Sequence, residues 1–87
     1  MDLNQTQKFN FGLSREDYIK SIINEVYSAL EEKGYDPVSQ MVGYILSGDP
    51  TYITGHKNAR SLIMKVERDE IMEFLVKFYV KNQWWLN

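Results

Sequence analysis

Hydrophobic and polar positions recur with the period of an α-helix in the first half of this chain, beginning near residue 14. Ser14 is a typical N-cap residue, acidic side chains follow it, and Gly34 suits the position just after a helix end. The pattern predicts a helix over residues 14–33. Its single buried stripe is expected to consist of Ile19, Ile22, Ile23, Val26, Tyr27 and Leu30.

A second helix is predicted after Asp36-Pro37, because Asp can cap a helix and Pro is favoured at its first position. Gly48 ends this helix. Gly43 lies inside it and costs about 1 kcal/mol relative to Ala, which indicates close packing against another helix at that point. The stripe that we expect this helix to bury consists of Val38, Met41, Val42, Ile45 and Leu46.

The later half of the chain is helical as well. Asp49-Pro50 repeats the capping signal and predicts a single turn over residues 50–53. Periodicity then permits two alternatives. One is a single helix from residue 56 to about residue 81. The other is two helices separated by a corner at residues 67–69, with Asp69 as the N-cap of the later helix. We favour the corner, because a compact fold needs the chain to turn back. The apolar positions involved are Ala59, Leu62, Ile63, Val66, Ile71, Met72, Leu75, Val76, Tyr79 and Val80.

Three segments follow from this pattern. Residues 1–13, the leader, are polar without a helical period, and we expect them to be flexible. Residues 14–83 form the predicted helical domain, and residues 84–87 are a short aromatic tail with two tryptophans. The predicted class is all-α, a small compact bundle of about five helices, three to four of them substantial and one a single turn.

Composition narrows the function classes. The chain is 44% hydrophobic and 25% charged, which is typical of a globular protein. Its 87 residues bury only a modest core alone, so we expect a homodimer. A net charge of −2 argues against nucleic acid as the main partner. We find no secretory signal and no apolar stretch near the roughly 18 residues of a membrane span, so a cytoplasmic protein without membrane insertion is expected.

Catalytic and cofactor motifs are absent from the sequence. There are no cysteines and no nucleophile elbow, Gly-rich phosphate loop or zinc spacing, so we expect no metal and no cofactor. The single histidine, His56, has Asp49 as its nearest acid in the sequence, across Gly and Pro. A general base needs a positioned partner and a cleft. We therefore interpret His56 as a surface or capping residue and expect no enzyme.

One basic segment, residues 54–68, interrupts this acidic chain. Its four positive side chains stand against Glu67 alone, and Lys57 and Arg60 are predicted to share a helix face near a positive helix end. An anion could dock there, or the face could simply be solvated. An alternative function is a small nucleic-acid-binding module that uses this segment. The predicted partner-binding residues are His56, Lys57, Arg60, Lys65 and Arg68.

A family resemblance adds to these predictions. The run "LEEKGYDPVSQMVGYILSGDPTYI", the later "HKNAR" and "ERDEI", and "QT" followed by "FNFG" in the leader resemble the IreB family of Firmicutes, which includes ReoM-type members. The likeness continues to about residue 82. The central block is long and ungapped, so the match is specific.

The resemblance implies a small all-helical cytoplasmic homodimer without enzymatic activity. It implies phosphorylation by the membrane-bound Ser/Thr kinase with extracellular PASTA domains, reversed by a cognate phosphatase. The phosphoacceptor threonine of the family aligns with Thr6. In ReoM-type members the unphosphorylated form promotes degradation of MurA by the ClpCP protease, and phosphorylation relieves this, raising peptidoglycan synthesis and cephalosporin tolerance.

This chain departs from the family pattern in the basic segment. Arg60 matches one basic residue that the activity needs, but Gly55 and Met64 stand where arginines are common. A phosphoryl group on Thr6 would add roughly −1.5 to −2 charges at neutral pH. It could then dock on Lys57 or Arg60, or repel an acidic partner surface.

Overall fold

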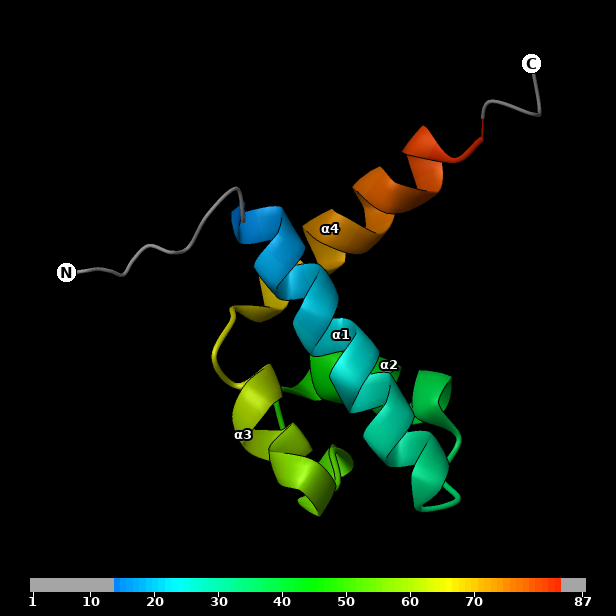
Figure 1. Ribbon diagram of the computed structural model, residues 1–87, viewed down its shortest axis with the longest axis vertical. Helices are drawn as coiled ribbons and strands as arrows, with labels where there is room; N and C mark the ends of the chain where they lie inside the picture. Colours follow the sequence, from blue (N-terminus) through cyan, green and yellow to red (C-terminus); the bar gives the residue numbers. More distant parts are fainter. Residues whose placement is uncertain (1–13, 84–87) are drawn as a thin grey trace, which may run out of the picture.

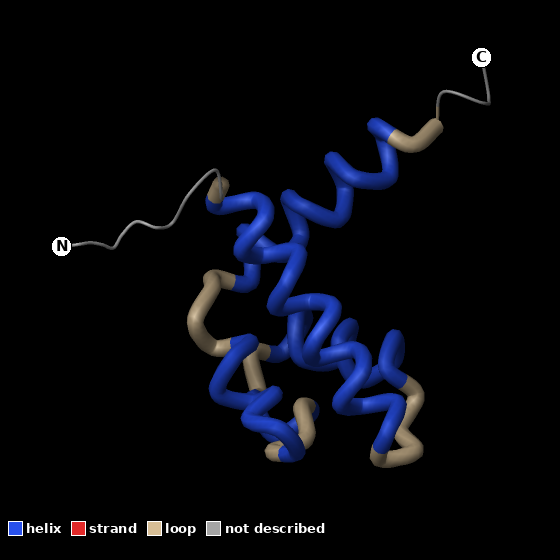
Figure 2. Tube along the Cα trace, viewed as in Figure 1, coloured by secondary structure: helices blue, strands red, loops and turns tan. Residues whose placement is uncertain are grey.

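The computed structural model describes residues 14–83, and helices make up most of this range (Figures 1 and 2). The predicted leader and aromatic tail lie outside this range. No strand occurs between residues 14 and 83, which confirms the all-α class. The elements are α1 (Arg15–Glu32), α2 (Pro37–Ser47), the 3₁₀ turns η1 (Pro50–Tyr52) and η2 (His56–Asn58), α3 (Ala59–Ile63) and α4 (Arg68–Lys81).

The first helix begins and ends as its sequence predicts. The Ser14 hydroxyl accepts a hydrogen bond from the Asp17 backbone N–H at 3.0 Å, and the Asp17 carboxylate accepts one from the Ser14 N–H at 3.3 Å. Past the C-terminal end, Gly34 adopts the left-handed conformation with φ +82°. These caps fix α1, which contacts α2, α3 and α4.

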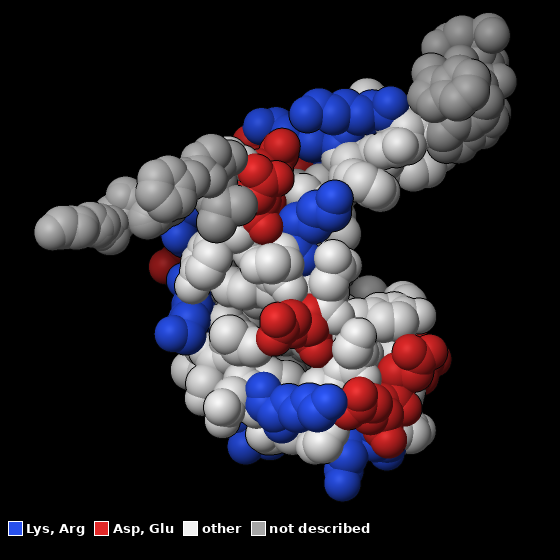
Figure 3. Space-filling view, viewed as in Figure 1, with Lys and Arg blue, Asp and Glu red and all other residues white. Residues whose placement is uncertain are grey.

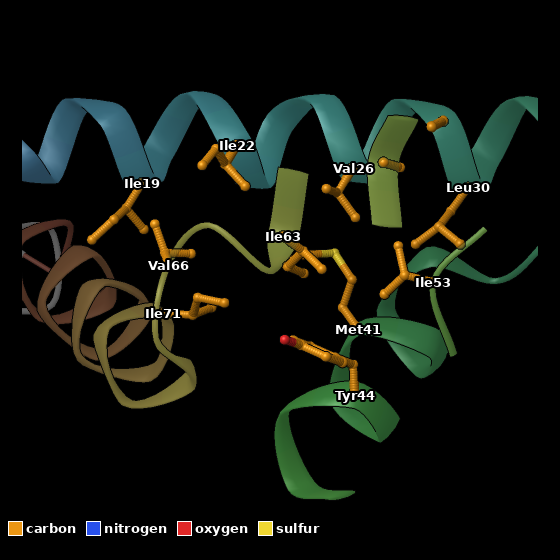
Figure 4. Close-up of a cluster of buried hydrophobic side chains, with 12 residues drawn as sticks. Ile19, Ile22, Val26, Leu30, Met41, Tyr44, Ile53, Ile63, Val66 and Ile71 are labelled. Carbon is orange, nitrogen blue, oxygen red and sulfur yellow. The ribbon is translucent and has the colours of Figure 1, made fainter. Parts of the chain in front are cut away.

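The core lies along one side of α1 (Figure 4). Ile53, Ile63 and Ile71 point toward α1 from the segment after η1, from α3 and from α4, and each is fully buried. The buried stripe of α1 is confirmed at four of its six predicted positions, while Ile23 is half-buried and Tyr27 is exposed. The buried residues are Ile19, Ile22, Val26, Ala29, Leu30, Met41, Tyr44, Ile53, Ala59, Ile63, Val66 and Ile71.

The predicted buried stripe of α2 is wrong in part. Met41 is buried and Ile45 half-buried, but the exposed fractions of Val38, Val42 and Leu46 are 60%, 47% and 76%. The face that meets the core is rotated toward Tyr44, which the stripe did not include. This helix carries apolar side chains on two faces, and periodicity alone does not decide which face the core covers.

The corner between α3 and α4 is confirmed, and the alternative of one continuous helix is wrong. Helix α4 begins two residues earlier than predicted, because its N-cap is Glu67 and not Asp69. The Glu67 backbone N–H donates to the Glu70 carboxylate at 2.9 Å. An acidic side chain in the first turn thus holds the start of α4.

A bidentate ion pair joins the starts of α1 and α4. Arg15 Nε and Nη2 each lie 3.0 Å from a carboxylate oxygen of Glu70. The hydrogen bonds from Arg15, and then the one from the Glu67 N–H, lower the pKa of Glu70 to about 2. The pair therefore links the N-terminal turns of these two helices.

Beyond this crossing, α4 carries its C-terminal half away from the other helices (Figure 1). Ile71 is buried and Phe74 packs partly against the core, but most of the apolar side chains predicted for this helix are exposed. The exposed ones are Met72, Leu75, Val76, Phe78, Tyr79 and Val80.

Gly43 is in close contact with a neighbour, but the predicted packing against another helix is wrong in its partner. A Cβ atom built on Gly43 would lie 2.6 Å from Tyr52 Cδ1, far inside van der Waals contact. The Gln40 amide holds the same turn by donating to the Tyr52 carbonyl at 2.9 Å. The neighbour is therefore the ring at the end of η1 and not another long helix.

Replacing Gly43 with Ala should destabilise the fold. Overpacking against Tyr52 costs about 1–3 kcal/mol, which exceeds the gain of about 1 kcal/mol in helix propensity. In a Tyr52→Ala background the same substitution should instead stabilise by up to about 1 kcal/mol. Chemical denaturation of the four proteins measures both values, and an equal effect of Gly43→Ala in both backgrounds would exclude Tyr52 as the constraint.

Candidate functional site in the basic segment

The basic segment folds into η2, α3 and the start of α4. Lys57 and Asn58 both have left-handed backbone conformations, with φ 53° and 62°. This double reversal separates Lys57 from α3, which begins at Ala59. The prediction that Lys57 and Arg60 share one helix face is therefore wrong, because the chain changes direction between them.

Glu32, near the end of α1, holds two of the predicted partner-binding residues. His56 Nε2 lies 2.8 Å from Glu32 Oε1, and Lys57 Nζ lies 3.2 Å from Glu32 Oε2. The bond to His56, and then the bond to Lys57, lower the pKa of the Glu32 carboxyl. Asp49 is the acid nearest to His56 in the sequence. The acid that contacts His56 in the fold is Glu32, which belongs to a helix far away in the sequence.

Arg60 lies across the end of η1. Its Nε donates to the Ile53 carbonyl at 2.8 Å, and its backbone N–H donates to the Thr54 carbonyl at 3.1 Å. The pKa of Asp49 is lowered chiefly by hydrogen bonds from Thr51, with a smaller contribution from the charge of Arg60. The guanidinium is exposed, so it can contact a partner while one of its nitrogens supports the loop.

Arg68 has a structural position at the end of α2. Its Nη1 donates to the Ile45 carbonyl at 2.8 Å, in the last turn of that helix. A Cβ on Gly48, which has φ +76°, would lie 2.8 Å from the Arg68 guanidinium carbon. Gly48 therefore serves both the left-handed helix end and the close approach of this side chain.

The fold thus divides the basic segment. His56 and Lys57 lie at the end of α1, Arg60 beside η1, and Arg68 at the end of α2, while Lys65 is exposed after α3. Figure 3 shows basic and acidic side chains next to one another on the face that it presents. This division weighs against a continuous basic surface for nucleic acid.

Neither a cluster of metal-ligating side chains nor a membrane-spanning helix occurs between residues 14 and 83. In this range we find no three His, Asp or Glu side chains that converge as metal ligands would. Across the same residues, no helix has the length and apolar character that crossing a membrane requires. Thr6, the predicted phosphoacceptor, lies outside the described residues.

Comparison with known proteins decides the family. The family described as "IreB regulatory phosphoprotein" matches residues 4–81, which is most of the 87-residue chain. This chain belongs to the IreB family. A "UPF0297 protein" of Lachnoclostridium phytofermentans is 60% identical over 81 residues, covering 93% of this chain and 92% of the relative. A "UPF0297 protein" of Ruminiclostridium cellulolyticum is 54% identical over 82 residues, covering 94% and 93%.

Two positions of the basic segment, at which the family resemblance led us to expect arginines, are sterically open. Gly55 has φ −78°, and a Cβ there would meet nothing within 4 Å. The exposed fraction of Met64 is 57%. The fold could therefore accept an arginine at either position without backbone strain.

Proposed function

We propose that this IreB-family protein is a non-enzymatic, cytoplasmic phospho-switch with Thr6 as its acceptor. The observation that carries the proposal is the family match, which spans residues 4–81 and so includes both Thr6 and the helical domain. A PASTA-type Ser/Thr kinase would add the phosphate and a cognate phosphatase would remove it. The unphosphorylated form would promote degradation of MurA by ClpCP, and so restrain peptidoglycan synthesis and antibiotic tolerance.

The environments of the other threonines support the choice of Thr6. The sequence contains two more, Thr51 and Thr54. The Thr51 hydroxyl donates to Asp49 at 2.7 Å, and the Thr54 hydroxyl accepts from the His56 N–H at 3.2 Å. Both belong to the turns that shape the basic segment. A kinase needs an extended substrate, so it would have to unfold these turns to reach either hydroxyl.

Phosphorylation of the purified protein by the kinase domain tests this assignment. Thr6→Ala should abolish phosphate incorporation, because the acceptor hydroxyl is gone. The matched control, Thr51→Ala with Thr54→Ala, should keep stoichiometric incorporation. Full phosphate incorporation into Thr6→Ala would contradict the assignment of Thr6. Mass spectrometry of the phosphorylated peptide locates the phosphate.

The dimensions of α1 bear on how the switch works. Its 18 residues span about 27 Å, and His56 and Lys57 lie at the end opposite Ser14. The eight residues from Thr6 to Ser14 reach at most about 26–29 Å when fully extended. Docking of phospho-Thr6 on Lys57 within one chain would therefore need a taut leader, at a high cost in conformational entropy. This disfavours docking of phospho-Thr6 on Lys57 within the chain, whereas docking on Arg60 and repulsion of an acidic partner surface both stay proposals.

The partner surface that we propose is the basic segment, with His56, Lys57, Arg60, Lys65 and Arg68 as its positive groups. Glu32 pairs with His56 and Lys57, and Arg68 donates a hydrogen bond to the end of α2. Arg60 and Lys65 are therefore the principal contacts that we propose for the partner. MurA, the ClpCP protease or both would present complementary acidic groups.

Adding basic residues to this surface should strengthen the interaction. The double variant Gly55→Arg, Met64→Arg should bind MurA or ClpCP at least several-fold more tightly than the wild type, because both positions are open and face solvent. A matched control, Gly55→Gln with Met64→Gln, adds comparable length without charge and should change little. Pull-down followed by titration calorimetry measures both, and equal binding by the Arg and Gln variants would contradict a basic partner surface.

We also propose that two copies associate through the exposed apolar faces of α2 and α4. These faces include Val38, Val42 and Leu46 on α2 and Val76 on α4. Exposed apolar groups of this kind mark interaction surfaces. A standard interface buries about 1,600 Å² in total, and the two faces together offer apolar area for it.

Sedimentation equilibrium tests this association. The wild type should have twice the chain mass of 10.3 kDa, and Leu46→Lys with Val76→Lys should shift it toward one chain mass by placing charges in the interface. The control Ser28→Lys adds a positive charge to an exposed position of α1 and should leave the dimer intact. A dimer of unchanged strength in the double variant would exclude these faces.

A further inference from the structure

Two adjoining hollows lie where α1 crosses α4. The first holds about 200 Å³, and buried Ile19 contributes to its apolar lining. The second holds about 130 Å³ and is lined by Phe78, half of which is exposed. Phe74 lines both, and charged groups such as Lys77 and Lys81 form the rims. Together they make a shallow apolar groove with charged edges, which we call the α1–α4 groove.

The size of each hollow suits one phenyl ring. An apolar cavity of about 150 Å³ holds a benzene molecule. The rings of Phe74 and Phe78, which lie along the groove, have centroids 5.9 Å apart. Side chains two residues apart on an extended segment lie on one face, about 6.5–7 Å apart. The ring spacing of a Phe-x-Phe segment is therefore close to the spacing of the two rings that line the groove, so such a segment can lay one ring beside each of them.

The leader contains this pattern and is joined to the wall of the groove. Phe9 and Phe11 are separated by one residue, and they precede Ser14 by five and three residues. These distances allow reaches of at most about 18 and 11 Å. Ser14 directly precedes Arg15, which lines the first hollow. Both hollows are thus within reach of the two rings.

The geometry points to the α1–α4 groove as the docking site of this chain's own leader, with Phe9 and Phe11 in the two hollows. Thr6, three residues before Phe9, is then held within about 11 Å of the groove. It lies at the end of α1 opposite Lys57. The proposed docking of the leader is a property of the unphosphorylated chain. It therefore does not depend on whether Thr6 is a phosphoacceptor.

The leader suits the groove better than the aromatic tail or a second copy. The tail follows Lys81, which lines the second hollow, but the first hollow is bordered by Glu70 and Glu73, two to three helical turns earlier. The leader instead joins the chain next to Arg15, which lines the first hollow. A second copy has the broader apolar faces of α2 and α4 available to it.

Nuclear Overhauser effects in the full-length protein test the docking. Methyl protons of Ile19 should show contacts with the ring protons of Phe9 or Phe11. Phe9→Ala with Phe11→Ala should remove these contacts and shift the Ile19 methyl signal. Asn10→Ala, the matched control between the two rings, should preserve both. Phe78→Ala, at a half-exposed position that leaves the core intact, should also weaken the contacts.

Three results would overturn the proposal. The first is an Ile19 methyl signal that does not respond to loss of both leader phenylalanines. The second is a set of contacts from Ile19 to the indole protons of Trp84 or Trp85 in place of the leader rings. The third is a leader contact seen only between differently labelled copies in a mixed sample, which would assign the groove to the leader of a second copy. Phosphate incorporation at Thr6 is measured in a separate experiment. Failure of the docking proposal therefore does not affect the phosphorylation proposal, and the reverse also holds.

Discussion

Burial of one stripe of α1 is the constraint on which the rest of the structure depends. Val26 and Leu30 are fully buried, and each such aliphatic side chain contributes about 1.5–3 kcal/mol when it leaves water. Ile53, Ile63 and Ile71 meet this stripe from three later parts of the chain. Because α1 packs against all three other helices, the position of every loop follows from how it reaches this stripe.

Charged groups then refine an arrangement that apolar burial has already set. Arg15 and Glu70 join the starts of two helices, and Arg68 closes the end of α2. The Arg15–Glu70 pair is exposed, and exposed ion pairs contribute little to stability. These contacts connect helix ends that the core has already brought close together.

The same charges reduce the number of basic groups that a partner could meet. Glu32 pairs with His56 and Lys57, so the basic segment presents less positive charge at the surface than its composition indicates. An exposed Arg60, exposed apolar side chains on α2 and α4, and the α1–α4 groove are the surface features of residues 14–83 that a partner could contact.

Local signals in the sequence determined the starts and ends of α1 and α2. The caps at Ser14 and Asp36 and the left-handed glycines at Gly34 and Gly48 depend on backbone geometry within a few residues, so they can be predicted without knowledge of the fold. The family motif and the basic composition of residues 54–68 are likewise visible in the sequence alone.

Only the tertiary structure decided which apolar face of α2 is buried and which acid His56 meets. A helix with apolar side chains on two faces can bury either one, and its neighbours choose between them. Glu32 and His56 are 24 residues apart, and no local rule joins them. The left-handed turn at Lys57 and Asn58 brings this pair together and separates Lys57 from Arg60. Local geometry therefore set the elements of this protein, whereas burial against α1 set the contacts between them.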